Sequence, residues 1–273
     1  MHRLVVGDEK RLGLAVDEQL RSAAPVGGQF RQRWERKFFV APRNIGLAYG
    51  LLRHVCRPDG EYPSEQINSL YFDTLDLDQH QRSADGDFKK DKVRIRWYGD
   101  NGTLPPMVPV FLELKSRRGF ASSKRRERFP EPAENLRLDR LPAGIMGKTT
   151  LLDTLARFGH FPGRPLRPII LISYWRYRFT EILTGVRVCL DHDIRSTLVA
   201  RELGRGEREL RLQGAVIEVK GLSADLPRIL KRVMELVDTD WSRFSKYSYC
   251  IDSHLADLGS TGRLWPSGRM AEP

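Results

Sequence analysis

Several short segments of the chain alternate lysine or arginine with apolar residues, a spacing that could hold a chain of phosphate groups. In one of them, Lys92, Arg94 and Arg96 point to one side and Val93 and Ile95 to the other, because side chains alternate across a strand. Arginine binds two phosphate oxygens at once through its planar guanidinium, and lysine supplies a point charge. These segments therefore predict strands with a basic face suited to a polyanion.

Acidic residues stand in the same segments at a recurring position. The pattern Glu-x-Lys occurs three times, at 35–37, 113–115 and 218–220. Such a carboxylate either neutralises a neighbouring cation or binds a hard divalent metal, which needs only one or two carboxylates when phosphate and water complete its shell. About a dozen cations gathered in one lumen would repel one another without a polyanion and a metal. The pattern therefore favours a metal-assisted site for chained phosphates.

Strands must position these side chains, and the chain is rich in them. Period-two alternation predicts strands at 33–40, 67–73, 91–98, 109–116, 124–129, 168–179, 185–191, 197–203, 208–213 and 215–220. Apolar residues at helical spacing predict helices at 43–56, 148–159 and 223–237. Many antiparallel strands with few helices indicate an α+β fold. A closed antiparallel β-barrel can enclose the basic faces as a tunnel, with helices packed outside.

The 273 residues carry a net charge of +11, which predicts an anionic partner and by itself leaves nucleic acid, a membrane surface and a polyphosphorylated substrate open. Residues 1–29 are expected to form a flexible arm, 30–256 a single domain and 257–273 a flexible tail. The sequence shows no run of about 18 apolar residues, no secretory signal and no disulfide or zinc pattern among its cysteines. We expect a cytoplasmic location without a membrane span, and nothing in the pattern selects an oligomeric state.

Eight short motifs follow one another along the chain: Arg33-Trp-Glu-Arg-Lys37, Ser69-Leu-Tyr-Phe-Asp-Thr74, Lys92-Val-Arg-Ile-Arg-Trp-Tyr98, Leu112-Glu-Leu-Lys115, Tyr174-Trp-Arg176, Val186-Arg-Val-Cys-Leu-Asp191, Ile217-Glu-Val-Lys220 and Phe244-Ser-Lys-Tyr247. Over about residues 31–252 the sequence thereby resembles the VTC domain, the polyphosphate polymerase branch of the triphosphate tunnel metalloenzymes, which are related to CYTH proteins. The resemblance implies a closed antiparallel barrel of about eight strands around a basic tunnel. It also implies transfer of the terminal phosphate of ATP onto a polyphosphate chain with Mn²⁺ or Mg²⁺ as cofactor.

The resemblance further implies roles for individual residues. Those expected to be catalytic are Arg94, Arg96, Lys115, Arg176, Arg187, Glu218 and Lys246. Those expected to bind substrate are Lys37, Arg126, Arg128, Lys220, Ser245 and Arg243, the last standing where a lysine is usual. Glu218 matches the metal-binding glutamate, whereas Glu35 either binds metal or pairs with lysine or arginine. Glu113 is an acid of second choice, and Lys124 joins Arg126 and Arg128 either at the tunnel or on a solvated face.

One position departs from the hydrolase relatives, which open with Glu-x-Glu-x-Lys. Arg33 replaces the first glutamate, and this exchange of a metal ligand for a cation favours a longer anion. We therefore predict an ATP–polyphosphate phosphotransferase whose partners are ATP and polyphosphate, with no nucleic acid. Two other classes stay open: a metal-dependent triphosphatase or nucleotide hydrolase of the same fold, and a non-catalytic module that binds polyphosphate or another polyanion.

Overall fold

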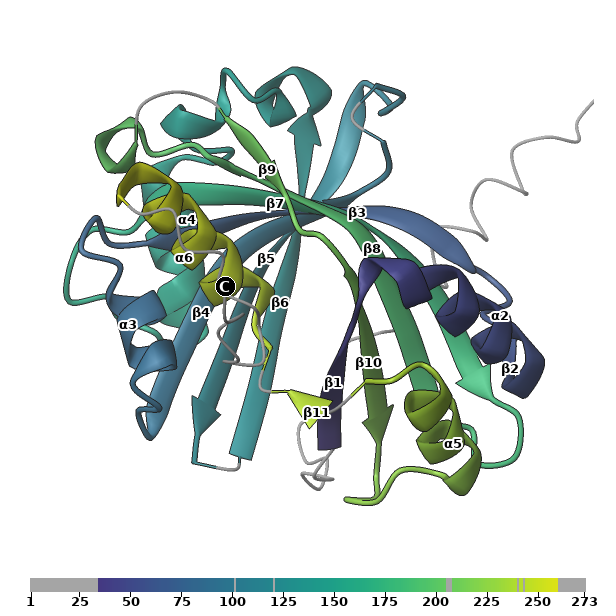
Figure 1. Cartoon of the computed structure of the whole chain (residues 1–273). Coiled ribbons are helices and arrows are strands. Elements are labelled where there is room, and N and C mark those ends of the chain that lie inside the picture. The colour runs from purple at the N-terminus through teal and green to yellow at the C-terminus, as the bar shows by residue number, and fades with distance from the viewer. Residues whose placement is uncertain are drawn as a thin grey trace, which may run out of the picture. The chain divides into compact units, whose positions relative to one another are not determined.

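The strands carry most of the architecture (Figure 1). A computed structural model of the protein describes residues 34–100, 102–119, 121–204, 208–239, 241–242 and 244–259. The strands are β1 Trp34–Val40, β2 Cys56–Pro58, β3 Ser64–Asp73, β4 Lys89–Tyr98, β5 Met107–Arg118, β6 Ala121–Pro132, β7 Arg167–Glu181, β8 Arg187–Leu198, β9 Glu209–Arg211, β10 Ala215–Gly221 and β11 Trp241–Ser242. The arm expected at 1–29 and residues 260–273 of the expected tail lie outside the described residues.

All of these strands join one antiparallel sheet, in the order β11-β1-β10-β8-β7-β3-β4-β5-β6, with β2 paired to β7 and β9 to β8. The sheet bends so that β4, β5 and β6 lie across from β1 and β10 (Figure 1). It does not close, however: among the described residues β6 pairs only with β5, so the closed barrel expected from the sequence is wrong. Charged side chains such as Lys124 and Arg126 on β6, together with Pro130, are typical of an edge strand that resists further pairing.

In the part of the chain that the structure describes, five α-helices accompany the sheet: α2 Ile45–Val55, α3 Asp78–Ala84, α4 Lys148–Arg157, α5 Arg228–Leu236 and α6 Lys246–Gly259. Three of them, α2, α4 and α5, lie within the ranges predicted from periodicity. Helix α5 begins later than predicted because Pro227 forms its N-cap. The strand predicted at 197–203 is wrong, since β8 ends at Leu198 and a 3₁₀ turn follows at Arg201–Leu203. None of the described helices is long and apolar enough to cross a membrane.

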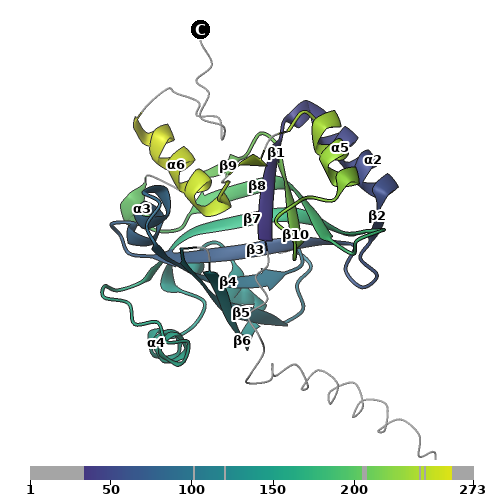
Figure 2. The same cartoon turned by 90° about the horizontal axis from the view of Figure 1, so that it is seen from below.

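Two apolar clusters cover the convex side of the sheet. One packs Leu151 and Leu155 of α4 against β3, β4 and β5, and the other packs Leu52 of α2 and Leu230 of α5 against β1, β8 and β10. Figure 2 shows α2 and α5 side by side, with α4 well away from them against another part of the bent sheet. These helices agree with the expectation that helices pack outside.

Helix α6 differs, because it packs on the concave face. Its Tyr247 and Ile251 join a third cluster with Ile170, Ile172 and Tyr174 of β7. Ile172 is the register partner of Ser69, which in turn pairs with Arg96, so this cluster shares the face of the basic residues. The concave side therefore has an apolar end under α6 and a charged remainder.

Candidate functional site

The register of the sheet assembles the charged face in rows. Directly opposed residues of antiparallel strands point to the same side. One row therefore runs across four strands through Tyr71, Arg94, Glu113 and Arg126. With strands about 4.8 Å apart, the row extends over about 14 Å.

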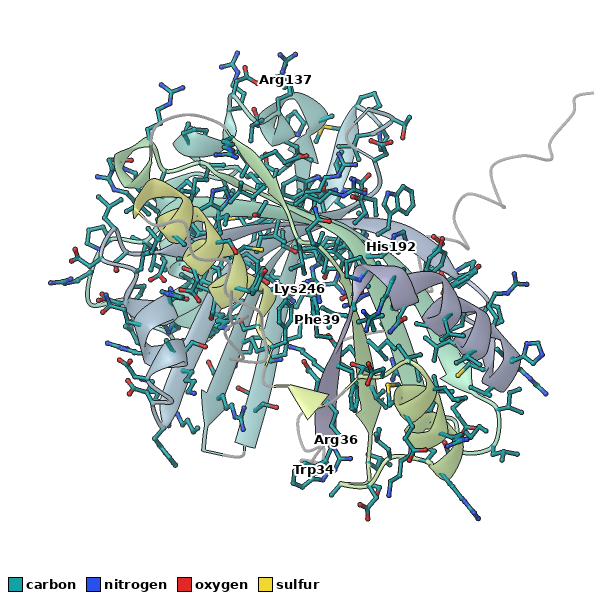
Figure 3. All side chains as sticks on the ribbon, viewed as in Figure 1. Trp34, Arg36, Phe39, Arg137, His192 and Lys246 are labelled. Atoms are coloured by element: carbon teal, nitrogen blue, oxygen red, sulfur yellow. The ribbon has the colours of Figure 1, made fainter. Side chains whose placement is uncertain are left out.

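A second set of rows lies on the other arm of the bent sheet. There Arg176 of β7 opposes Asp191 of β8, while Glu218 of β10 opposes Lys37 of β1. Figure 3 shows Lys246, the first residue of α6, near the centre of the molecule, whereas Arg36, on the opposite face of β1, lies toward the far end of that strand. The strands thus bring together residues far apart in the chain, such as Lys37 and Glu218.

Glu113 is the centre of the first ion cluster. It is 1% exposed, and Arg94 donates to its Oε2 from Nε at 2.8 Å and from Nη2 at 2.7 Å. Lys124 Nζ lies 2.7 Å and Arg126 Nε 3.5 Å from the other oxygen, Oε1. Burial alone would raise the pKa of Glu113, but the adjacent Arg94, Arg96 and Lys124 outweigh it and lower that pKa far below its usual range. Glu113 is therefore an anion that orders three cations.

Asp191 plays the same part in the second cluster. Arg176 donates Nε to Oδ1 at 2.6 Å and Nη2 to Oδ2 at 2.8 Å, a bidentate pair, and Lys246 Nζ lies 2.5 Å from Oδ2. Glu218 adjoins this cluster through Arg176 Nη2 at 3.7 Å and forms an ion pair with Lys220. Burial opposes ionisation of Asp191 and of Glu218, but the facing cations keep the pKa of each below its usual range.

Glu35 links the two arms of the sheet. Its Oε1 lies 3.0 Å from Lys37 Nζ on the same strand, and its Oε2 accepts from Lys115 Nζ of β5 at 3.2 Å. Burial by itself would raise the pKa of Glu35, but the two lysines outweigh burial and lower that pKa to about 2. A side-chain ion pair therefore crosses the concave face between β1 and β5, two strands that are not paired through their backbones.

Some cations on this face have only neutral partners. Arg96 donates Nε to Ser69 Oγ at 3.2 Å and Nη2 to the Tyr174 hydroxyl at 3.3 Å. Lys92 donates to Ser245 Oγ at 2.8 Å. Neither forms an ion pair among the described residues, so both can neutralise an incoming anion without first breaking one.

The remaining predicted residues are less central. Arg187 is exposed and opposes Lys220 at the end of its row, and Arg128 is exposed and opposes Phe111. Arg126 stands over the Phe111 ring, with its guanidinium carbon 3.5 Å from the centroid. Arg33 and Arg243 lie outside the described residues.

Sequence reasoning missed two members of the face as site residues. Asp191 entered only as the last residue of a motif, and Lys92 entered as one of the cations on the basic face of its strand but was given no role of its own. The sequence feature that could have identified both residues is the period-two alternation that also assigns Arg94 to this face. Parity shows which side a residue faces but says nothing of its ionic partner, which lies on another strand.

The carboxylates of this face suit a hard divalent cation only if phosphate oxygens supply further ligands. Glu35 and Glu218 lie on adjacent strands at diagonal register positions, where Glu35 opposes Lys220 and Glu218 opposes Lys37. Within the described ranges no group of three or more His, Cys, Asp or Glu side chains could hold a metal. Two carboxylates fit Mn²⁺ or Mg²⁺ when phosphate oxygens and water supply the other ligands. The two carboxylates are thus compatible with a divalent metal that binds together with a phosphate substrate.

Acid is expected to unfold the protein through these carboxylates. Glu35, Glu113, Asp191 and Glu218 have lowered pKa values in the folded state, so their stabilisation is complete above the usual carboxyl pKa and is lost as the pH falls through the folded-state values. The urea midpoint should be nearly constant between about pH 6 and pH 5 and should fall from about pH 4 to about pH 2. Glu35→Gln should make the fall shallower. A midpoint that stays unchanged down to about pH 2 would contradict the assignment.

Solved structures resemble the chain at low identity. An adenylate cyclase of provisional assignment from Bacillus halodurans is 16% identical, with 78% of this chain and 95% of that chain covered and a TM-score of 0.47. A second provisionally assigned adenylate cyclase, from Vibrio parahaemolyticus, is 14% identical, with coverages of 82% and 99% and a TM-score of 0.40. The RNA triphosphatase Pct1 of S. pombe is 9% identical, with coverages of 94% and 88% and a TM-score of 0.27. No curated protein matches the sequence.

The family comparison covers most of the molecule. The model of the VTC domain matches residues 32–255. This range contains all eleven strands, from β1 to β11, and the part of α6 that begins at Lys246. It also contains the two ion clusters and the Glu35 ion pairs described above, and the resemblance inferred from the eight motifs is confirmed. The chain belongs to the VTC domain family.

Proposed function

We propose that the protein is a polyphosphate polymerase that transfers the terminal phosphate of ATP onto a polyphosphate chain. The observation that carries this proposal is the excess of cations along the concave face. Among its described carboxylates are Glu35, Glu65, Asp73, Glu113, Asp191 and Glu218, and among its more numerous described cations are Lys37, Lys92, Arg94, Arg96, Lys115, Lys124, Arg126, Arg128, Arg176, Arg178, Arg187, Lys220 and Lys246. A face that is basic over about 14 Å matches a linear anion of several phosphates better than a single phosphate.

The arrangement suits phosphoryl transfer, which depends on neutralising charge and aligning the reacting oxygens more than on a protein nucleophile. Asp191 orders Arg176 by occupying its Nε and Nη2, which leaves Nη1 to face an anion. Glu113 orders Arg94 in the same way, and the Tyr71 hydroxyl accepts from Nη1 of Arg94 at 3.0 Å. Guanidinium groups held in this way lose little conformational entropy when phosphate binds.

Glu218 and Glu35 are the residues that would hold Mn²⁺ or Mg²⁺. When bound, the metal supplies positive charge that neutralises bridged phosphate oxygens. Lys37 and Lys220, which pair with these two carboxylates, would share them with the metal and would contact the substrate phosphates. Arg96 and Lys246 hold the chain deeper on the face, near the Tyr174 ring, whose centroid lies 5.0 Å from Lys246 Nζ.

Incubation of the purified protein with ATP and Mn²⁺ or Mg²⁺ tests the proposal. We expect long polyphosphate on a polyacrylamide gel and none in the presence of EDTA, because the face binds the anion while the metal completes charge neutralisation. Orthophosphate without chain growth would instead indicate a hydrolase. Absence of any turnover, with polyphosphate still bound, would indicate a binding module. Either result would overturn the polymerase proposal.

A further inference from the structure

Lys92 occupies a distinctive place on the charged face. It lies on β4, two residues before Arg94, and its register partner on β5 is Lys115. Its Nζ donates to Ser245 Oγ at 2.8 Å and stands 5.7 Å from the centroid of the Tyr247 ring. The side chain of Lys92 therefore reaches from the sheet to Ser245, the residue that precedes α6.

The charged groups that face Lys92 are mostly of its own sign. These groups are Lys90 and Arg94 on β4 itself, Lys115 on β5 and Lys37 on β1. The α3 and α6 side contributes Tyr247, whose hydroxyl donates to Asp73, and His80, which pairs with Asp252. Glu35, the carboxylate that neutralises Lys37 and Lys115, makes no ion pair with Lys92, and neither does any other acid among the described residues.

Burial and the like charges together weaken proton binding at Lys92. Burial is the larger cause, and the nearby Lys37, Lys115, Arg94 and Lys90 add to it, so the pKa of Lys92 falls to about 7. By contrast, the pKa of Lys37 and of Lys220 is raised, because their carboxylate partners outweigh burial. An anion that entered beside Lys92 would supply the counter-charge that this position lacks.

We propose that Lys92 is a further anion-binding residue of this site, and that it takes up a proton from the solvent when a chain of phosphates enters. The amine becomes an ammonium group, the proton comes from the buffer, and the Ser245 hydroxyl keeps Nζ aimed at the space between β4 and α6. This inference rests on the proposed role of the face in binding phosphates and is independent of catalysis. Binding of the substrate is thereby linked to pH through one lysine.

Calorimetric titration with tripolyphosphate in EDTA tests the inference, because it needs neither metal nor turnover. The titration is run at about pH 8 in two buffers that differ in ionisation enthalpy, which gives the number of protons taken up. Wild type should take up about one proton more than Lys92→Arg, since arginine keeps its charge. Between about pH 8 and pH 9 the wild-type affinity should also fall up to tenfold more steeply than that of Lys92→Arg.

Two further variants separate the possible outcomes. Lys92→Met should lose about tenfold or more in affinity as well as the extra proton. Lys89→Met removes the same charge from the opposite face of the strand and should keep wild-type proton uptake. Equal uptake by wild type and Lys92→Arg, with both binding tripolyphosphate, would overturn the role of Lys92 alone. Failure of wild type to bind tripolyphosphate would overturn the proposed function together with this inference.

Discussion

Replacing Glu218 by glutamine is expected to lower polyphosphate synthesis from ATP by about 100-fold or more. Glutamine keeps the shape of the side chain but removes the charge that would hold the metal. The same change takes a negative charge away from a face that binds anions, so metal-free binding of tripolyphosphate should be as tight as in wild type or tighter. The prediction is thus a split between turnover and binding, measured on a polyphosphate gel and by calorimetry.

Glu127→Gln is the matched control for this experiment. Glu127 lies on β6 but faces the other side of the sheet, where it pairs with Arg157 at 2.6 Å, so synthesis should be unchanged. The thermal midpoint of Glu218→Gln shows whether the variant is folded. Full synthesis by a folded Glu218→Gln protein would remove this glutamate from the site, and lost binding together with lost synthesis would indicate a structural role instead.

Replacing Asp191 by alanine is expected to lower the free energy of unfolding by about 3–5 kcal/mol. The carboxylate is fully buried, and its removal leaves two cations without their main partner in a poorly solvated place. The side chains of Arg176 and Lys246 are only 11% and 10% exposed, so water cannot replace the lost charge. Urea unfolding at about pH 7 measures the change.

Asp76→Ala is the control for a surface ion pair. Asp76 is 69% exposed and pairs with Arg164, so its removal should change the free energy of unfolding by less than about 1 kcal/mol. Adding Lys246→Met to Asp191→Ala removes one of the two stranded cations and should recover part of the loss. A single variant Asp191→Ala as stable as wild type would show that solvent or Glu218 compensates for the missing carboxylate.

Local pattern was a good guide to the strands and to their two faces. Arg94 and Arg96 were assigned to one side and Val93 and Ile95 to the other, and the register confirms this, because alternation along a strand is a property of neighbouring residues. Helix α6 was missed although its Tyr247 and Ile251 are buried. Its apolar residues pack against β7, and that contact is absent from any local window.

Whether the sheet closes into a barrel could not be predicted from the local sequence pattern. Whether β6 meets β1 depends on the bend and twist accumulated over the eight strands from β1 to β6, which no single segment specifies. A family resemblance implied a closed barrel, but in the structure β6 is an open edge, and side chains such as Glu35 and Lys115 meet across the concave face instead. The face toward which each side chain points was therefore predictable, while closure of the sheet by pairing of its end strands was not.

The sequence by itself determined that a chain of net charge +11 places much of its excess on one side of its strands, because alternation sorts residues by parity. Only the tertiary structure decided which carboxylate neutralises which cation. Glu35 meets Lys115 eighty positions away, whereas Lys92 forms no ion pair with a described residue and donates to the Ser245 hydroxyl. The reason is physical: an ion pair forms between groups brought within a few ångströms by the register of other strands, and its strength depends on the burial that packing supplies.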